Sequence, residues 1–373
     1  MITEFSILRL FSTWFKSVDI LNIFLIILLA SLGLLFVTTA SPSIAKLKNL
    51  DEFYFVKKHG VFMMLSLMIL ICFSFFSKKF ILNLSFFSAF FFYLLMIYSL
   101  YQNQVNNGAS RWVIIFGYSI QPSELLKPFL IVIQAYLISR KNKFRINSFL
   151  IDGKMLAFLV LVITSLILFS QPNYSMIAIL FFVLMSQFFI SGFNIRLVAL
   201  TLIATVAFSV ISFFSLAHVK NRIINHIFSD KPNYQVEKSI EAYKTGGLFG
   251  VGTGEGKVKK YIPDAHTDFI FPVIAEEYGT IVCNLIIIII FTIFFRGLYR
   301  TSKINNSFSL LASSGLLVLF LSQSLVNICV SLKIIPTTGV TLPLISYGGS
   351  SLISMGIVMG IMLSLTRKKF GFI

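Results

Sequence analysis

The chain has 373 residues, of which 57% are hydrophobic and only 12% are charged, and its formal net charge is +17. A soluble globular domain has about 45–50% apolar and about 25% charged residues, so this composition excludes that class. Lys and Arg in membrane proteins mostly contact anionic headgroups, and no basic run here is interleaved with exposed aromatics in a soluble module. The charge therefore favours membrane contact and argues against nucleic acid as a partner.

Residues 1–18 carry aromatic and basic side chains at mostly helical spacing, which predicts a cytoplasmic tail or an interfacial helix. The arrangement of a cleaved signal peptide is missing, so the first apolar block stays in the mature protein. Apolar blocks of about 17–25 residues, long enough to cross about 30 Å of hydrocarbon, recur along the chain. They predict ten transmembrane helices, at about 19–40, 60–76, 80–100, 123–139, 155–170, 174–193, 195–217, 269–295, 307–332 and 347–365.

The predicted fold is an all-α polytopic membrane protein, with residues 1–373 as a single integral membrane domain. A large extracytoplasmic loop, 218–268, separates helices 7 and 8. One side of the membrane collects sixteen Lys and Arg residues and the other fourteen, eight of which lie in that loop beside six acidic residues. The positive-inside rule then predicts that the sixteen-charge side, with both termini, is cytoplasmic. The three cysteines lie in apolar blocks without paired spacing and predict core residues.

Ionisable side chains within spans are costly and usually functional. Glu124 and Lys127 stand three residues apart at the start of the fourth span, so they can pair on one helix face, and Gln134 extends that face. The pair either braces the bundle or contacts substrate. Gln323 and Asn327, one turn apart, predict a polar stripe on the ninth span.

Two further patterns concern helix ends and helix packing. Pro122 and Ser123 predict a helix start, with Gln121 before it and Glu124 in the first turn, where the helix dipole favours an acid. Arg111 and Trp112 predict either an interfacial anchor or a bidentate contact of the guanidinium with an anionic headgroup. Near the C-terminus, the small residues Gly356 and Gly360 predict close helix packing.

Residues 246–279 form the one long polar segment. It begins rich in glycine, continues with three lysines, and presents His266, Thr267 and Asp268 just before an apolar helix. Its glycines do not make a nucleotide phosphate loop, because no strand precedes them and no GK[ST] follows. Asp268 is the best candidate for chemistry, although Asp268 or Thr267 could also cap the helix. His266 either takes part directly or positions Asp268 by a hydrogen bond.

Seven segments together resemble the SEDS family (shape, elongation, division and sporulation; FtsW and RodA types). In chain order they are GASRW, QPSELLK, QPN, YKTGGLFGVG, IPDAHTDFIF, AEEYG and LPLISYGGSSL. The resemblance covers roughly residues 19–365. Ala265 within IPDAHTDF and the segment LKIIPTTGVTLP resemble the cell-division (FtsW) type more than the elongation (RodA) type.

This resemblance implies a peptidoglycan glycosyltransferase that polymerises lipid II into β-1,4 glycan strands for septal cell-wall synthesis. The growing strand, linked through pyrophosphate to undecaprenyl lipid, is transferred with inversion to the 4-hydroxyl of an incoming lipid II. The resemblance also implies a class B penicillin-binding protein (FtsI type) and other divisome proteins as partners. The implied location is the bacterial cytoplasmic (inner) membrane at the division septum. The essential acid of the HTD motif corresponds to Asp268.

The chemistry of such a transfer fits these residues. A base must take the proton of the attacking hydroxyl, and cations must stabilise the departing pyrophosphate. Partial burial of Asp268 beside the membrane would raise its basicity. The available cations are Arg111, Lys127, Lys259 and Lys260, and a divalent ion such as Mg²⁺ could share their task. The predicted site has Asp268 as catalytic base and no metal-ligand set. The supporting residues are Arg111, Gln121, Ser123, Glu124, Lys127, Lys260, His266, Thr267, Ser346, Gly348, Gly349 and Ser350.

The chain departs from the family pattern at two places. Ser110 replaces a common Arg before Arg111, and Asn173 and Ser175 replace an Asp and a Gly after Gln171. Two alternative functions also remain open: a lipid II flippase or transporter, to which ten spans with broken helices would be suited, and a divisome scaffold.

Overall fold

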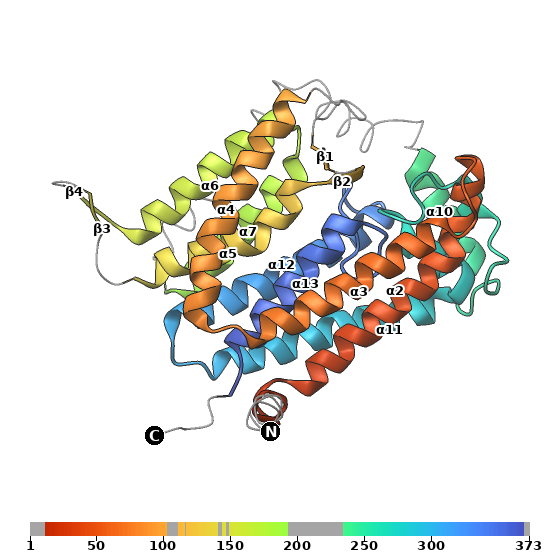
Figure 1. Ribbon diagram of the computed structural model, residues 1–373. Coiled ribbons are helices and arrows are strands. Elements are labelled where there is room, and N and C mark those ends of the chain that lie inside the picture. The colour runs from red at the N-terminus through yellow and green to blue at the C-terminus, as the bar shows by residue number, and fades with distance from the viewer. Residues whose placement is uncertain are drawn as a thin grey trace, which may run out of the picture.

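The computed structural model describes residues 12–102, 111–115, 117–140, 144–146, 149–192 and 234–368. These residues form a bundle of helices (Figure 1). The predicted span 195–217, the first part of the predicted loop, most of the predicted N-terminal tail and Ser110 lie outside the described residues.

Each predicted span that falls on described residues contains one helix, and the helix ends differ from the predicted ends by at most seven residues. An additional helix, α10, precedes the glycine-rich loop and was not predicted. The helices are α2 (Ile20–Leu47), α3 (Tyr54–Phe75), α4 (Lys78–Tyr101), α5 (Pro122–Ser139), α6 (Gly153–Ser170), α7 (Tyr174–Ile190), α10 (Tyr234–Gly246), α11 (Ile270–Ser302), α12 (Ser307–Ser331) and α13 (Gly349–Leu365), with a short 3₁₀ helix η1 (Val258–Tyr261).

Six described helices are long and apolar enough to cross a membrane: α2, α3, α4, α6, α11 and α12. Helices α7 and α13 are apolar but shorter, with 17 residues each. In a membrane every backbone polar group must be satisfied within the segment, which long apolar helices achieve. The chain is therefore a multi-pass membrane protein.

Two short hairpins connect the helices and were not predicted, because strands of three residues leave little periodic signal. Strands β1 (Val113–Ile115) and β2 (Tyr118–Ile120) pair antiparallel, with Val113 opposite Ile120. Strands β3 (Phe144–Ile146) and β4 (Phe149–Ile151) pair likewise. The first hairpin ends at Ile120, just before Gln121, the N-cap of α5, and so brings Arg111 back toward the start of that helix.

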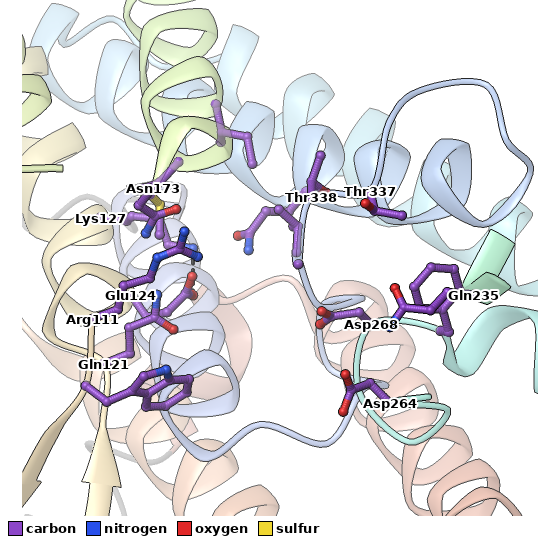
Figure 2. A pocket seen from close by; sticks show the side chains of 17 residues that line it. Arg111, Gln121, Glu124, Lys127, Asn173, Gln235, Asp264, Asp268, Thr337 and Thr338 are labelled. Carbon is purple, nitrogen blue, oxygen red and sulfur yellow. Dashed lines mark hydrogen bonds and ion pairs between the residues drawn. The ribbon is translucent and has the colours of Figure 1, made fainter. Parts of the chain in front are cut away.

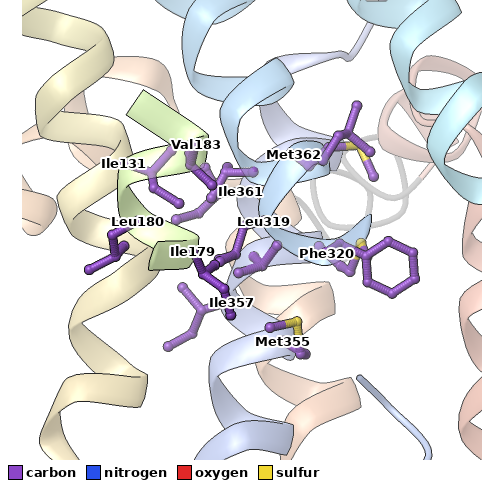
Figure 3. Close-up of a cluster of buried hydrophobic side chains, with 14 of the residues drawn as sticks. Ile131, Ile179, Leu180, Val183, Leu319, Phe320, Met355, Ile357, Ile361 and Met362 are labelled. Carbon is purple, nitrogen blue, oxygen red and sulfur yellow. The ribbon is translucent and has the colours of Figure 1, made fainter. Parts of the chain in front are cut away.

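The core lies where α5, α7, α12 and α13 meet (Figure 3). Ile131, Leu180, Phe320 and Met362, one from each helix, are at most 1% exposed. In the most apolar 18-residue stretch of α12, 72% of the residues are buried within the protein, whereas in that of α4 only 22% are. Helix α12 is therefore central, and α4 presents most of its surface to lipid.

Helix α13 packs closely on α3, as the two small residues predicted. A Cβ atom at Gly356 would lie 2.4 Å from the carbonyl oxygen of Ser66, and one at Gly360 would lie 2.7 Å from that of Leu70. The hydroxyl of Ser66 donates to the carbonyl of Leu352 at 2.6 Å. The packing prediction is confirmed, and it fixes α13 beside α3 along one face.

The glycine-rich loop after α10 pairs backbone to backbone with a break in α11. Gly279 has φ of 80° inside α11, so the helix predicted as continuous is kinked there. The amide of Val251 donates to the carbonyl of Glu276 at 2.9 Å, and that of Thr280 donates to Gly247 at 3.0 Å. A Cβ at Gly250 would lie 2.3 Å from the carbonyl oxygen of Glu277. The glycines are needed because only they permit this close approach.

Candidate active site

A polar cavity of about 340 Å³ lies among the first turns of α5 and α7, the segment before α11 and the loop between α12 and α13. Figure 2 shows its two facing walls, and in this view Thr337 and Thr338 lie above Asp268 and Gln235. One wall carries Arg111, Gln121, Glu124, Lys127 and Asn173, and the opposite wall carries Gln235, Asp264 and Asp268.

Glu124 and Lys127 form an ion pair on the first wall, with 2.6 Å between Lys127 Nζ and Glu124 Oε2. The predicted pairing is confirmed. Lys127 is fully buried, while Glu124 is partly open to the cavity. The hydroxyl of Ser354 in α13 donates to the carbonyl of Glu124 at 2.7 Å, so the first turn of α5 is held against α13.

Gln121 lies at the same wall, just before α5. Its backbone amide donates to the hydroxyl of Ser350 at 3.0 Å, and its side-chain Nε2 donates to Ser123 Oγ at 3.3 Å. Ser123 and Ser350 are not among the residues that line the cavity. They support the wall by holding Gln121.

Arg111 is held at the C-terminal end of α6. Its Nε donates to the carbonyl of Gln171 at 2.9 Å, and its Nη2 donates to that of Pro172. Carbonyls at a helix C-terminus carry partial negative charge, so they stabilise a guanidinium. The QPN segment, whose Asn173 also lines the cavity, therefore fixes a cation at the cavity wall.

Asp268 lies on the opposite wall, in a turn that precedes α11. The amide of Thr267 donates to the carbonyl of Asp264 at 2.9 Å, and its hydroxyl donates to the same oxygen at 3.1 Å. Helix α11 begins at Ile270 with Phe269 as N-cap and no side-chain cap bond. The prediction that Asp268 or Thr267 caps the helix is wrong, because the turn ends before the helix starts and leaves the Asp268 carboxylate to the cavity.

Asn327 in the predicted polar stripe of α12 holds this turn. Its Nδ2 donates to the backbone carbonyl of Asp268 at 2.8 Å and to that of Val340 at 2.7 Å. Gln323, one turn earlier, lines the cavity. Gly339 has φ of 72°, and a Cβ there would lie 3.5 Å from Asp268 Oδ2. The loop between α12 and α13 therefore closes against the carboxylate.

Burial raises the pKa of Asp268 to about 7, with smaller contributions from the negative charges of Asp264 and Glu124. Low dielectric surroundings disfavour the charged form of a carboxyl, and like charges nearby add to this. A carboxylate with a pKa near neutrality can accept a proton and release it again at physiological pH.

His266 does not have the position expected of it. It is buried, and its ring lies against those of Phe55 and Tyr347, with centroids 4.5 Å and 5.2 Å away. Burial lowers the pKa of His266 to about 4, with further lowering by the charges of Lys48 and His59. Among the described residues it makes no hydrogen bond to Asp268, so the predicted positioning bond is wrong and the ring serves packing.

Two predicted cations are not at the cavity. Lys259 is buried, and its Nζ pairs with Glu277 and donates to the carbonyl of Thr39 at 2.9 Å. Glu276 accepts from the backbone amides of Val258 and Lys259, at 2.7 Å and 2.8 Å. Both interactions anchor the polar segment to α11. Lys260 is exposed and is not among the residues that line the cavity.

The remaining predicted residues support the site from behind. Ser346 Oγ donates to the carbonyl of Thr267 at 2.6 Å and accepts from the amide of Leu342 at 2.9 Å. A Cβ at Gly349 would lie 2.9 Å from the ring of Phe62, so α13 starts close to α3. Gly348 is the N-cap of α13. None of the three lines the cavity.

A third carboxylate, that of Asp264, and the loop between α12 and α13 were not predicted from the sequence. Asp264, Thr337, Thr338 and Gly339 all line the cavity. The signal for Asp264 was present in IPDAHTD, four residues before Asp268, and the loop belongs to the LKIIPTTGVTLP segment. Ser175, a departure from the family pattern, donates its hydroxyl to the carbonyl of Thr338 at 3.1 Å and so ties this loop to α7.

The side chains present do not form a metal site by themselves. Mg²⁺ prefers oxygen ligands in octahedral geometry, commonly one or two carboxylates together with substrate phosphates. In the described parts of the chain, no group of three or more His, Cys, Asp or Glu residues is placed to hold an ion. We therefore assign no step to a metal.

Comparison with known proteins gives consistent matches over nearly the whole chain. Residues 19–370 match the family model FTSW_RODA_SPOVE, described as cell cycle protein. A relative from Caulobacter vibrioides, named probable peptidoglycan glycosyltransferase FtsW, is 35% identical over 92% of this chain and 88% of its own.

Two solved structures share the fold. A chain from a peptidoglycan synthase complex that coordinates polymerization and crosslinking has a TM-score of 0.75 and 24% identity, covering 94% of this chain and 97% of its own. The rod shape determining protein RodA of Thermus thermophilus has a TM-score of 0.69 and 23% identity, with 94% and 96% coverage.

Proposed function

Because the chain belongs to the FtsW, RodA and SpoVE family of cell cycle proteins, we propose that it is a peptidoglycan glycosyltransferase that polymerises lipid II during septal cell-wall synthesis. The observation that carries this proposal is the cavity in which the Asp268 carboxylate faces the Glu124–Lys127 pair and Arg111.

The reaction joins two lipid-linked sugars. The 4-hydroxyl of the acceptor GlcNAc gives its proton to Asp268 as its oxygen attacks the anomeric carbon of the donor strand. The bond from that carbon to the pyrophosphate oxygen breaks on the opposite face, so the configuration inverts. The leaving group departs as undecaprenyl pyrophosphate with the bonding electron pair, and Asp268 later releases its proton to solvent.

The pKa of Asp268 supports its role as the base. At a pKa of about 7 the carboxyl is about half ionised at neutral pH and is more basic than an ordinary aspartate. General bases work best with a pKa near the operating pH. A second carboxylic acid is not needed, since the pyrophosphate leaves as an anion without prior protonation.

Arg111 and Lys127 supply positive charge toward the leaving group. Lys127 is neutralised in part by Glu124, so Arg111 is the stronger candidate for contact with pyrophosphate. Its guanidinium is fixed by two carbonyls and therefore needs little reorganisation when charge develops, which is the condition for electrostatic stabilisation. Glu124 then keeps Lys127 charged and in place.

The proposal also includes how the chain is oriented in the membrane. Ten spans in one integral membrane domain, with both termini cytoplasmic, would put loop 218–268 and the cavity at the outer surface of the inner membrane. There the chain would work beside a class B penicillin-binding protein and other divisome proteins at the septum. The position of Asp268 before a helix, rather than inside a span, favours an enzyme over a transporter.

An assay of purified chain in lipid vesicles tests the proposal. Lipid II is added outside, and products are separated by gel electrophoresis with and without the cognate penicillin-binding protein. The proposal expects glycan strands that lysozyme digests. Movement of lipid II across the bilayer without any strand synthesis, even with the partner present, would favour a flippase instead.

A further inference from the structure

A second and larger cavity, of about 1250 Å³, lies at the other end of α11 from Asp268. It is bounded by the last turns of α11 and α13, the connection from α11 to α12, and the turn between α3 and α4. Arg296, which lines it, is 26 residues after Ile270 and lies beyond the break at Gly279, toward the C-terminal end of α11. The proposed transfer reaction does not use it.

The cavity is strongly basic. Among the described residues that line it, none is Asp or Glu and six are Lys or Arg, namely Lys78, Arg296, Arg300, Lys303, Arg367 and Lys368. Like charges gathered around one cavity repel each other, and the repulsion grows where protein excludes water. Such a cluster is stable only with counter-charge nearby.

One buried carboxylate supplies part of this counter-charge. Asp19, before α2, accepts from Nε of Arg296 at 3.0 Å and from Nε of Arg300 at 3.1 Å. Nη1 of Arg300 is buried and has no hydrogen-bond acceptor in the described part of the chain. Arg296 and Arg300 share this one carboxylate, so Asp19 does not neutralise both of them.

Two of the cations also have structural contacts. Arg367 donates to the carbonyls of Phe75 and Phe76, where α3 ends, at 3.2 Å and 2.9 Å. Lys303 donates to the hydroxyl of Tyr299 at 2.6 Å and lies over its ring. Neither contact is with an acid, so neither contact neutralises the side chain that makes it.

The position of the cavity indicates which anion it takes. It lies where the membrane-spanning helices end, and Phe295 and Tyr299 beside it are 59% and 58% exposed, as expected of side chains that face lipid. Basic pockets between transmembrane helices at the membrane surface bind phosphate-bearing headgroups, and guanidinium groups match phosphate oxygens bidentately. Its volume exceeds the range of about 300–1,000 Å³ that is usual for small-ligand pockets, which leaves room for a glycerophosphate headgroup.

We propose that this cavity binds the phosphodiester headgroup of an anionic phospholipid from the leaflet at that end of the bundle. Arg296 and Arg300 form its half-buried side, with side chains 34% and 16% exposed, and Lys303 and Lys368 form its exposed rim. Soluble phosphate shares this chemistry, and the experiment separates the two sources.

Native mass spectrometry of the full chain, released from detergent with equal phosphatidylglycerol and phosphatidylcholine, counts the lipids retained. We expect selective retention of phosphatidylglycerol. The double variant Lys303→Gln/Lys368→Gln removes two exposed positive charges. It should reduce that selectivity about thirtyfold, because each charge near anionic headgroups changes binding about fivefold and the two factors multiply. Arg300→Gln tests the half-buried side in the same measurement, and unchanged thermal unfolding of the Lys double variant shows that its loss of selectivity is not misfolding.

A matched control removes two exposed lysines at the other end of the bundle, as Lys244→Gln/Lys257→Gln. It should retain phosphatidylglycerol as the parent chain does. Equal retention by the Lys303/Lys368 variant and the control would overturn the proposal. In a second arm, displacement of phosphatidylglycerol by millimolar inorganic phosphate or pyrophosphate would assign the cavity to a soluble anion and would also overturn it.

Discussion

The side-chain amide of Asn327 bonds the backbone carbonyl of Asp268 at 2.8 Å and that of Val340 at 2.7 Å. One side chain on the central helix thus fixes both the turn that carries the candidate base and the loop that closes against it. Asn327 does not line the cavity, so it is a positioning residue.

Asn327→Leu should lower kcat about ten- to hundredfold and leave KM within about twofold, because it moves the base without removing substrate contacts. A displacement of about 1 Å in a reacting group can lower rates about a hundredfold. Steady-state polymerisation rates at several lipid II concentrations measure the split. Ser322→Ala on the same helix, whose hydroxyl bonds only the carbonyl of Leu319 among described residues, is the control. A rise in KM at unchanged kcat would argue against positioning.

The pH profile should follow the ionisation of Asp268. A base must be deprotonated, so kcat/KM should rise about tenfold per pH unit below its pKa and level off above about pH 7. Asp264→Asn removes a nearby negative charge, which lowers the pKa of Asp268. The rising part of the kcat/KM profile, its acidic limb, should therefore move to lower pH. Glu241→Gln, an exposed change on α10, should not move it. An acidic limb at the same pH in Asp264→Asn as in the parent chain would contradict the assignment of Asp268 as the base.

Glu124→Ala and Lys127→Ala should each reduce activity and stability, and their effects should not add. Removal of one partner leaves the other charge unpaired in a largely buried position, a loss of about 3–5 kcal/mol. In the double variant no charge is left, so its loss should be smaller than the sum by at least about 1 kcal/mol. Thermal unfolding in detergent and initial rates measure the cycle. Additive losses would mean that the pair does not act as a unit.

Gly250→Ala should destabilise the polar segment more than Gly254→Ala. The two glycines have similar φ angles, 80° and 85°, but only at Gly250 would a Cβ meet backbone, 2.3 Å from the carbonyl oxygen of Glu277. Left-handed strain alone amounts to about 1–2 kcal/mol for a residue with a Cβ. Unfolding temperatures of the purified variants compare them, and equal losses would show that the close approach to α11 adds nothing.

Hydrophobic block length predicted the spans, because crossing a membrane imposes a length that sequence displays directly. The ends were less accurate, as α2 continues to Leu47 through Pro42. Helix α10 was missed because its polar composition carries no membrane signal, and the break at Gly279 depends on pairing with a loop about 30 residues earlier in the chain.

The site was predictable where its chemistry is local. Glu124 and Lys127 pair within one turn, and spacing alone indicates this. Spacing could not distinguish Lys259, buried against Glu277, from the exposed Lys260, nor could it show that His266 packs between two rings. Such placements depend on contacts between residues far apart in the chain, for which one sequence holds no record.

The central claim is that the Asp268 carboxylate takes the proton of the attacking hydroxyl. The most direct measurement is lipid II polymerisation by purified Asp268→Asn, in a preparation free of other polymerases and with the cognate penicillin-binding protein. Asp264→Asn is the matched control from the same cavity wall. We predict no glycan strands from Asp268→Asn, although it folds and binds its partner, and strands from Asp264→Asn. Strand synthesis by Asp268→Asn at the parent rate would contradict the account.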